Sequence, residues 1–168
     1  MKKTSNISNI LGLFKSYLIN QNKLADNPIA KSSIRNYISD TKHFLYWALK
    51  QAIEHNSTTA QDSISIFKWL NKDLLESYKT DLFAKKVPVS TIDRRISSIR
   101  RFFQFCIFKN YINDKNIGQI TNLSTDLQIK KQQLMFSRFL KEKHNLSEDT
   151  IRTILDDINE MLAVSTSN

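Results

Sequence analysis

The sequence predicts an all-α protein, and three features of its composition support that fold class. The 168 residues include only two glycines and two prolines, so few positions favour the tight hairpins that join strands. Leucine, lysine, isoleucine, glutamine and asparagine are abundant, and most of these residues tolerate helices well. A hydrophobic content of 40 % is enough for a buried core. We therefore expect a helical protein, with four helical segments in the first part of the chain, residues 1–122, and two further helices in residues 123–168.

Apolar side chains at helical spacing predict the first two helices. The first helix spans about residues 7–21, and the chain then breaks around Asn27-Pro28. Ser32 or Ser33 is expected to cap a second helix that runs to about Ile53, because a hydroxyl can accept a hydrogen bond from an unpaired amide of the first turn.

The next two helices follow a polar stretch, residues 55–63, which predicts a loop. A third helix begins at Asn71 or Asp73, and residues 85–88 end it because proline restricts the residue before it. Ser90 is expected to cap the fourth helix.

The fourth helix separates apolar from polar side chains. At about 100° per residue, one stripe is apolar and consists of Ile92, Ile96, Ile99, Phe103 and Cys106. The opposite stripe consists of Ser90, Arg94, Ser97 and Arg101. Arg95 and Arg100 flank the apolar stripe, where their aliphatic stems could cover apolar neighbours.

The second helix repeats this design. Its predicted core stripe consists of Ile34, Tyr37, Ile38, Thr41, Leu45, Ala48 and Ala52. The side chains facing away from the core are Ser32, Asn36, Ser39, His43 and Lys50, with Arg35, Lys42 and Tyr46 at the margin. Such side chains can contact phosphates and base edges in a major groove. A solvated surface that improves solubility is the alternative interpretation, and His43 on the polar face also fits that one.

Positive charge is confined to the first part of the chain. Residues 1–122 hold 19 Lys and Arg against 9 Asp and Glu, a net charge of +10. Residues 123–168 hold 6 against 7, a net charge of −1. The difference favours a module that binds a polyanion, followed by a segment with another task. Lysine-rich proteins can also be basic without binding nucleic acid.

Residues 123–163 predict two further amphipathic helices, separated at Asn145-Leu146-Ser147, with Ser147 as the cap of the second. LMFSRFL at 134–140 is similar to LGLFKSYL at 11–18, and TIRTILDDINEML at 150–162 is similar to SIRNYISDTKHFL at 33–45. Either these residues are a half-repeat or the match arises by chance between amphipathic helices. A half-repeat would expose apolar faces unless they pack on residues 1–122 or on another chain.

Several functional classes have little support in the sequence. Cys106 lies in an apolar run, which predicts a buried, unreactive thiol. One cysteine and three scattered histidines offer no metal-ligand spacing, and nothing indicates a cofactor. No signal peptide or membrane-spanning stretch is predicted, so we expect a cytoplasmic protein.

An ordered series of segments resembles the N-terminal, SAM-like core-binding domain of tyrosine recombinases, the phage integrase family. The segments are LFKSYL at 13–18, SIRNYISDTKHFLYW at 33–47, LLESYKTDL at 74–82, STIDRRISSIRRFFQF at 90–105 and YINDKNIGQI at 111–120. The family's second-helix pattern is followed by Ser33, Tyr37, Asp40, Thr41 and Phe44. Its fourth-helix pattern is followed by Thr91, Arg94 or Arg95, Ile96, Ser97, Ile99, Arg100 and Phe102. Asn116-Ile117 departs from the Asn-Pro that is common in the family.

The resemblance implies a SAM-like bundle of four or five helices that lies across duplex DNA, with the second and fourth helices near the major groove. The candidate DNA contacts are Lys31, Ser32, Arg35, Asn36, Ser39, Lys42, His43, Ser90, Thr91, Arg94, Arg95, Ser97, Ser98 and Arg101. Family catalysis needs a downstream tyrosine nucleophile and a His-x-x-Arg box, whereas Tyr111 is the last tyrosine and His144 precedes Asn-Leu-Ser. We therefore expect DNA binding in aid of recombination or integration, without catalysis by this chain.

Two other functions remain open at this point. The basic faces could dock an acidic protein while the C-terminal helices bind a second copy or other recombinase subunits. RNA binding is the third, although the sequence lacks a motif for stacking single-stranded bases.

Overall fold

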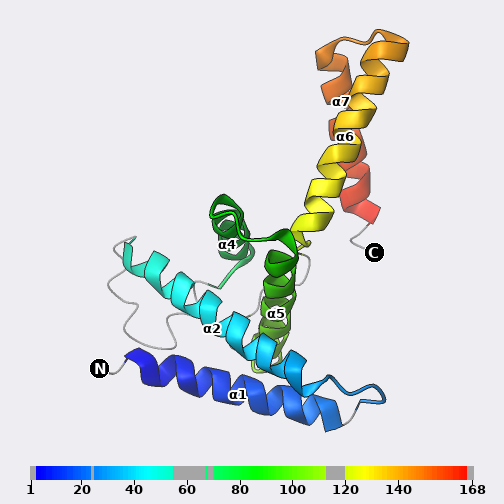
Figure 1. Cartoon of the computed structure of the whole chain (residues 1–168). Helices are drawn as coiled ribbons and strands as arrows, with labels where there is room; N and C mark the ends of the chain where they lie inside the picture. Colours follow the sequence, from blue (N-terminus) through cyan, green and yellow to red (C-terminus); the bar gives the residue numbers. More distant parts are fainter. Residues whose placement is uncertain (1–2, 24, 55–66, 68–69, 113–119, 166–168) are drawn as a thin grey trace. The chain divides into compact units, whose positions relative to one another are not determined.

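The computed structural model describes residues 3–23, 25–54, 67, 70–112 and 120–165, and these residues confirm the all-α prediction. They contain no strand. The helices are α1 (Lys3–Lys23), α2 (Lys31–Glu54), α4 (Lys72–Ala84), α5 (Val89–Phe108), α6 (Leu123–His144) and α7 (Glu148–Ser165) (Figure 1). The predicted loop at 55–63 and the Asn116-Ile117 departure lie outside the described residues.

The chain forms two compact units, Met1–Leu123 and Ser124–Asn168. In the first unit α5 packs against α1, α2 and α4, and its contact with α2 is the most extensive. Figure 1 shows α2 crossing α5, with α1 alongside α2. This arrangement makes α2 and α5 the central pair of the bundle.

Aromatic side chains from four helices fill the core of the first unit. Phe14 meets Phe102 edge to face at 5.3 Å between ring centroids, and Phe44 meets Tyr78 at 5.2 Å in the same geometry. These four rings are fully buried. Edge-to-face contacts add to the stability that burial of the rings provides. The apolar stripe predicted for the fourth helix is confirmed, because all five of its members are at most 1 % exposed.

Two of the predicted N-terminal caps, those of the second and fourth helices, are wrong. α2 begins at Lys31, one residue before Ser32, and the Ala30 carbonyl accepts from the Ile34 amide at 3.2 Å. α5 begins at Val89, and Pro88 takes the cap position without any side-chain cap. The Pro88 carbonyl accepts from the amides of Thr91 and Ile92, so Ser90 lies inside the first turn and not at its cap. The Asn71 cap of α4 is confirmed, since its Oδ1 accepts from the Leu74 amide at 2.8 Å.

Several helices end at residues in the left-handed conformation that are not glycine. Lys86 follows α4 with φ 56°, and Asn110 follows α5 with φ 56°. After α4, the Val87 amide donates to the Leu82 carbonyl and the Lys86 amide to the Phe83 carbonyl, which is the Schellman pattern. The same pattern follows α5. Asn145 ends α6 with φ 50°.

The connection between α1 and α2 is fastened by one side chain. Asn22 Nδ2 donates to the Ile29 carbonyl at 2.8 Å, and Asn22 Oδ1 accepts from the Ile29 amide. These two bonds hold the end of α1 beside the start of α2 across the predicted break at Asn27-Pro28. They therefore shape the surface where the two helices meet.

The second unit is a pair of helices, α6 and α7, joined at residues 145–147 as predicted. Ser147 caps α7 by accepting from the Thr150 amide at 3.2 Å. Gln133 donates to Asn159 at 2.8 Å, and Leu140 and Ile151 are buried. Most other apolar side chains of the pair are exposed: Leu127, Ile129, Leu134, Met135, Phe136, Phe139 and Met161.

Candidate nucleic-acid interface

The predicted polar face of α2 is exposed to solvent. The candidate DNA contacts on this helix, all of them exposed, are Lys31, Ser32, Arg35, Asn36, Ser39, Lys42 and His43. The face predicted on α5 divides into three groups. Ser90, Arg94 and Ser97 are exposed, whereas Thr91, Arg95 and Arg101 are partly buried. Ser98 is fully buried.

A buried carboxylate lies where α2 meets α5. The Asp40 side chain is 4 % exposed, and its Oδ2 accepts from Arg94 Nη1 at 2.6 Å and from Ser98 Oγ at 2.8 Å. Arg95 Nε lies 4.0 Å from Asp40 Oδ1. The inclusion of Ser98 among the DNA contacts is therefore wrong, because its hydroxyl points inward to satisfy this carboxylate. Arg94 remains 43 % exposed, so part of its guanidinium still faces solvent.

Asp40 is the functional residue that sequence reasoning missed. It appeared only as one position of the resemblance pattern, and the charge count treated it as an ordinary acidic residue. A signal was present, since Asp40 interrupts the apolar side of α2 while arginines border the apolar side of α5. A buried carboxylate needs such a cation, because an unpaired buried charge is costly.

His43 joins a second polar contact, between α2, α4 and α5. Its Nδ1 lies 2.7 Å from the Tyr78 hydroxyl, and its Nε2 lies 3.5 Å from Arg95 Nη1. Arginine can only donate, so Nε2 accepts and Nδ1 carries the proton that is donated to Tyr78. Burial and the neighbouring Arg95 charge lower the pKa of His43, and burial raises the pKa of Tyr78 to about 12. The neutral imidazole is thus the form that this site favours.

The remaining arginines of α5 play different parts. Arg100 donates to Asn122 Oδ1 at 2.5 Å and to Ser97 Oγ at 3.1 Å. Arg100 thereby fixes the segment that leads to α6, and Lys79 of α4 donates to the Thr121 carbonyl at 3.4 Å in the same segment. Arg101 donates to Gln104 at 3.1 Å, and its buried Nε has no hydrogen-bond partner within the described chain.

The described residues carry neither a metal-binding cluster nor a membrane-spanning helix. They contain no group of three or more His, Cys, Asp or Glu side chains placed to hold a metal ion. Among those same residues, no helix is both long and apolar enough to span a bilayer.

The comparisons with known proteins concern the region that carries both polar faces. A family model described as phage integrase, N-terminal SAM-like domain, matches residues 11–110. No curated protein and no solved structure matches the chain. The matched range includes all of α2, α4 and α5, together with the part of α1 that contains Phe14.

Proposed function

Because the chain belongs to the phage integrase family through its N-terminal SAM-like domain, we propose that residues 1–123 bind duplex DNA through the outer faces of α2 and α5. The proposed role is to hold DNA in the cytoplasm for site-specific recombination or integration. In this proposal the given sequence binds the DNA, and residues outside this sequence cleave the strands.

The Arg94–Asp40 ion pair is the observation that best supports this role. The pair joins α5 to α2, so the half-exposed guanidinium is fixed close to the line where the two helices cross. A fixed arginine loses less side-chain entropy when it binds a phosphate or a base edge than a mobile one would. Asn36 and Ser97 are exposed on the outer faces of the same two helices and offer hydrogen bonds for base or backbone contacts.

The charge of the first unit supports the same proposal. Residues 1–122 carry a net charge of +10, which would attract the phosphate backbone over a range of about 8–10 Å at ordinary salt concentration. Binding of this kind releases counterions, so the affinity should fall with a log–log slope of roughly 0.9 for each phosphate neutralised.

The test compares charge changes on and off the proposed face. Asn36→Asp with Lys42→Glu alters two exposed α2 side chains that have no ion pair within the described residues. Fluorescence anisotropy with a labelled duplex should show weaker binding, on the order of tenfold, and a shallower salt dependence. Lys72→Glu with Ser77→Asp makes the same change of net charge on α4 and serves as the control. Equal binding by both variants would overturn the proposed face.

A second role, self-association, is favoured by the exposed apolar side chains of α6 and α7. We infer that this helix pair associates with a second copy of itself. α6 carries 5 Lys and Arg against 2 Asp and Glu, whereas α7 carries 1 against 5. α6 of one copy would therefore attract α7 of another, while the apolar side chains between them become buried.

A further inference from the structure

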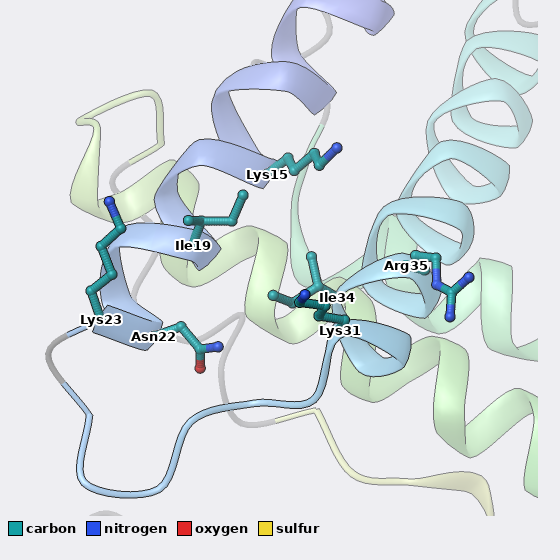
Figure 2. Close-up of a pocket in the computed structure, with 7 residues that line it drawn as sticks. All are labelled: Lys15, Ile19, Asn22, Lys23, Lys31, Ile34 and Arg35. Atoms are coloured by element: carbon teal, nitrogen blue, oxygen red, sulfur yellow. The ribbon is translucent and has the colours of Figure 1, made fainter.

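A pocket lies between the C-terminal half of α1 and the first turns of α2, and it shares Lys31 and Arg35 with the candidate DNA contacts (Figure 2). Its volume is about 670 Å³. Four of its lining residues are cations: Lys15 and Lys23 from α1, and Lys31 and Arg35 from α2. Figure 2 shows Ile19 and Ile34 between the two helices, with Lys31 beside Ile34, while Lys23 and Arg35 leave the outer sides of α1 and α2. The pocket thus has an apolar floor and a positive rim.

Among the described residues, no carboxylate lines this rim. None of the four cations forms an ion pair within the described residues. Asp26 lies in the connection between the helices and is not part of the lining. Lys31 and Arg35 are four residues apart on one helix, where like charges repel. The folded chain therefore carries an electrostatic cost here that a bound anion would remove.

The dipole of α2 increases that cost. Lys31 stands at the first position of α2, and the first turn of this helix contains no acidic residue. Helix N-termini carry partial positive charge and favour anions, so a lysine here is unfavourable unless an anion is present. Lys23 has an ordinary structural explanation, because it lies in the last turn of α1, where the dipole favours a cation. The dipole of α2 offers no such explanation for Lys31.

The floor of the pocket would strengthen the attraction to an anion. Ile34 is 8 % exposed and Ile19 is 38 % exposed, so both cover the interior side of the site with apolar surface. Charges interact more strongly beside apolar surface than in bulk water. Asn22 shapes one end, and its amide group is already engaged by both polar groups of the Ile29 backbone. Recognition at this site would accordingly depend on charge.

We propose that this pocket binds a phosphate group. Two sources could supply it: a backbone phosphate of duplex DNA or the polyphosphate chain of a free nucleotide. In the first case the inference rests on the proposed duplex binding and adds a contact beside the α2 face. In the second case the inference does not depend on duplex binding.

Filling the pocket without changing its charge provides the test. Ile19→Trp adds bulk at a half-exposed position, and Leu13→Trp places the same side chain at a position that is 42 % exposed and outside the lining. Duplex binding is measured by anisotropy, and tripolyphosphate binding by calorimetry. Ile19→Trp should weaken at least one of them on the order of tenfold, while Leu13→Trp matches the wild type. Weaker duplex binding alone would identify a DNA backbone phosphate as the ligand, and weaker tripolyphosphate binding alone would identify a free nucleotide.

A second variant tests whether binding depends on the pocket itself or only on the overall positive charge of the chain. Lys15→Gln with Lys23→Gln should cause the same loss as Ile19→Trp, and it replaces that variant if circular dichroism shows that the tryptophan unfolds the chain. Wild-type binding of both probes by Ile19→Trp would overturn the proposal, even where the glutamine variant binds less. Failure of tripolyphosphate to bind, together with unchanged duplex binding in Ile19→Trp, would also overturn it. In either case the response of Asn36→Asp with Lys42→Glu still reports separately on the proposed function.

Discussion

Arg94 and Asp40, 54 residues apart in sequence, form a 2.6 Å ion pair that fastens α5 to α2. The carboxylate is buried and the guanidinium is half-exposed, so one arginine serves both the bundle and its outer surface. A charge reversal at Arg94 would place a second carboxylate against Asp40. Loss of DNA binding in such a variant would therefore mix unfolding with loss of contact, which is why the tests of the face use Asn36 and Lys42.

The first prediction concerns the stability of this contact. Arg94→Gln should lower the free energy of unfolding by about 1–3 kcal/mol, because it leaves the buried Asp40 without its closest cation. The value lies below that of a fully buried pair because Arg94 is partly solvated. Urea denaturation followed by circular dichroism measures it. Arg101 donates to the neutral side chain of Gln104, so Arg101→Gln should cost less. Equal losses in the two variants would contradict the assigned role of Asp40.

The second prediction concerns pH. Burial and Arg95 lower the pKa of His43 in the folded chain, whereas the unfolded imidazole keeps an ordinary value near 6.5. As the pH falls through about 6.5, the unfolded state binds a proton before the folded state does, so stability should decrease. The decrease ends once the pH passes below the folded pKa. Urea midpoints measured from about pH 8 to about pH 5 should show this step in the wild type.

His43→Gln should remove that step, whereas His144→Gln on the second unit should retain it. A step of the same size in both variants would assign the proton to a different group.

The third prediction concerns the single cysteine. Cys106 is fully buried, and burial raises the pKa of its thiol well above the ordinary value, so almost no thiolate forms near neutral pH. A disulfide reagent such as Ellman's reagent should label the native chain only at the rate of unfolding, and immediately in denaturant. Because the sequence has one cysteine, all labelling reports on this site. Rapid labelling of the native chain would contradict its placement in the core.

The fourth prediction concerns association through α6 and α7. Leu134 is 63 % exposed on α6, so Leu134→Glu should remove apolar contact area without disturbing the interior of the helix pair. Sedimentation velocity should show the wild type associating with rising concentration and the variant remaining smaller. Gln128→Glu changes charge on the same helix and should behave as the wild type. A wild type that stays monomeric throughout would exclude the second copy as the partner.

Sequence periodicity predicted the helices and the core because both depend on local spacing. Ile92, Ile96 and Ile99 repeat at helical intervals, and all three are fully buried. The cap at Ser90 was wrong because Pro88 closes the first turn with its own carbonyl. Ser98 was placed on the surface because it stands beside polar neighbours, yet its environment is set by Asp40 from a different helix. Pairings of this kind, like the pocket between α1 and α2, depend on which helices meet and not on the spacing within one.

In the described part of the chain, glycine stands inside a helix, where it is unfavourable, and other residues stand at the helix ends, where glycine is usually preferred. Gly12 stands inside α1, where an added Cβ would meet no atom within 4 Å and where glycine weakens a helix. Lys86, Asn110 and Asn145 occupy the left-handed helix ends, where glycine would relieve backbone strain. Substitutions at these four positions, all outside the aromatic core, should therefore raise the thermal stability of the chain. An engineered form could combine these substitutions while its core and its α2–α5 surface stay unchanged.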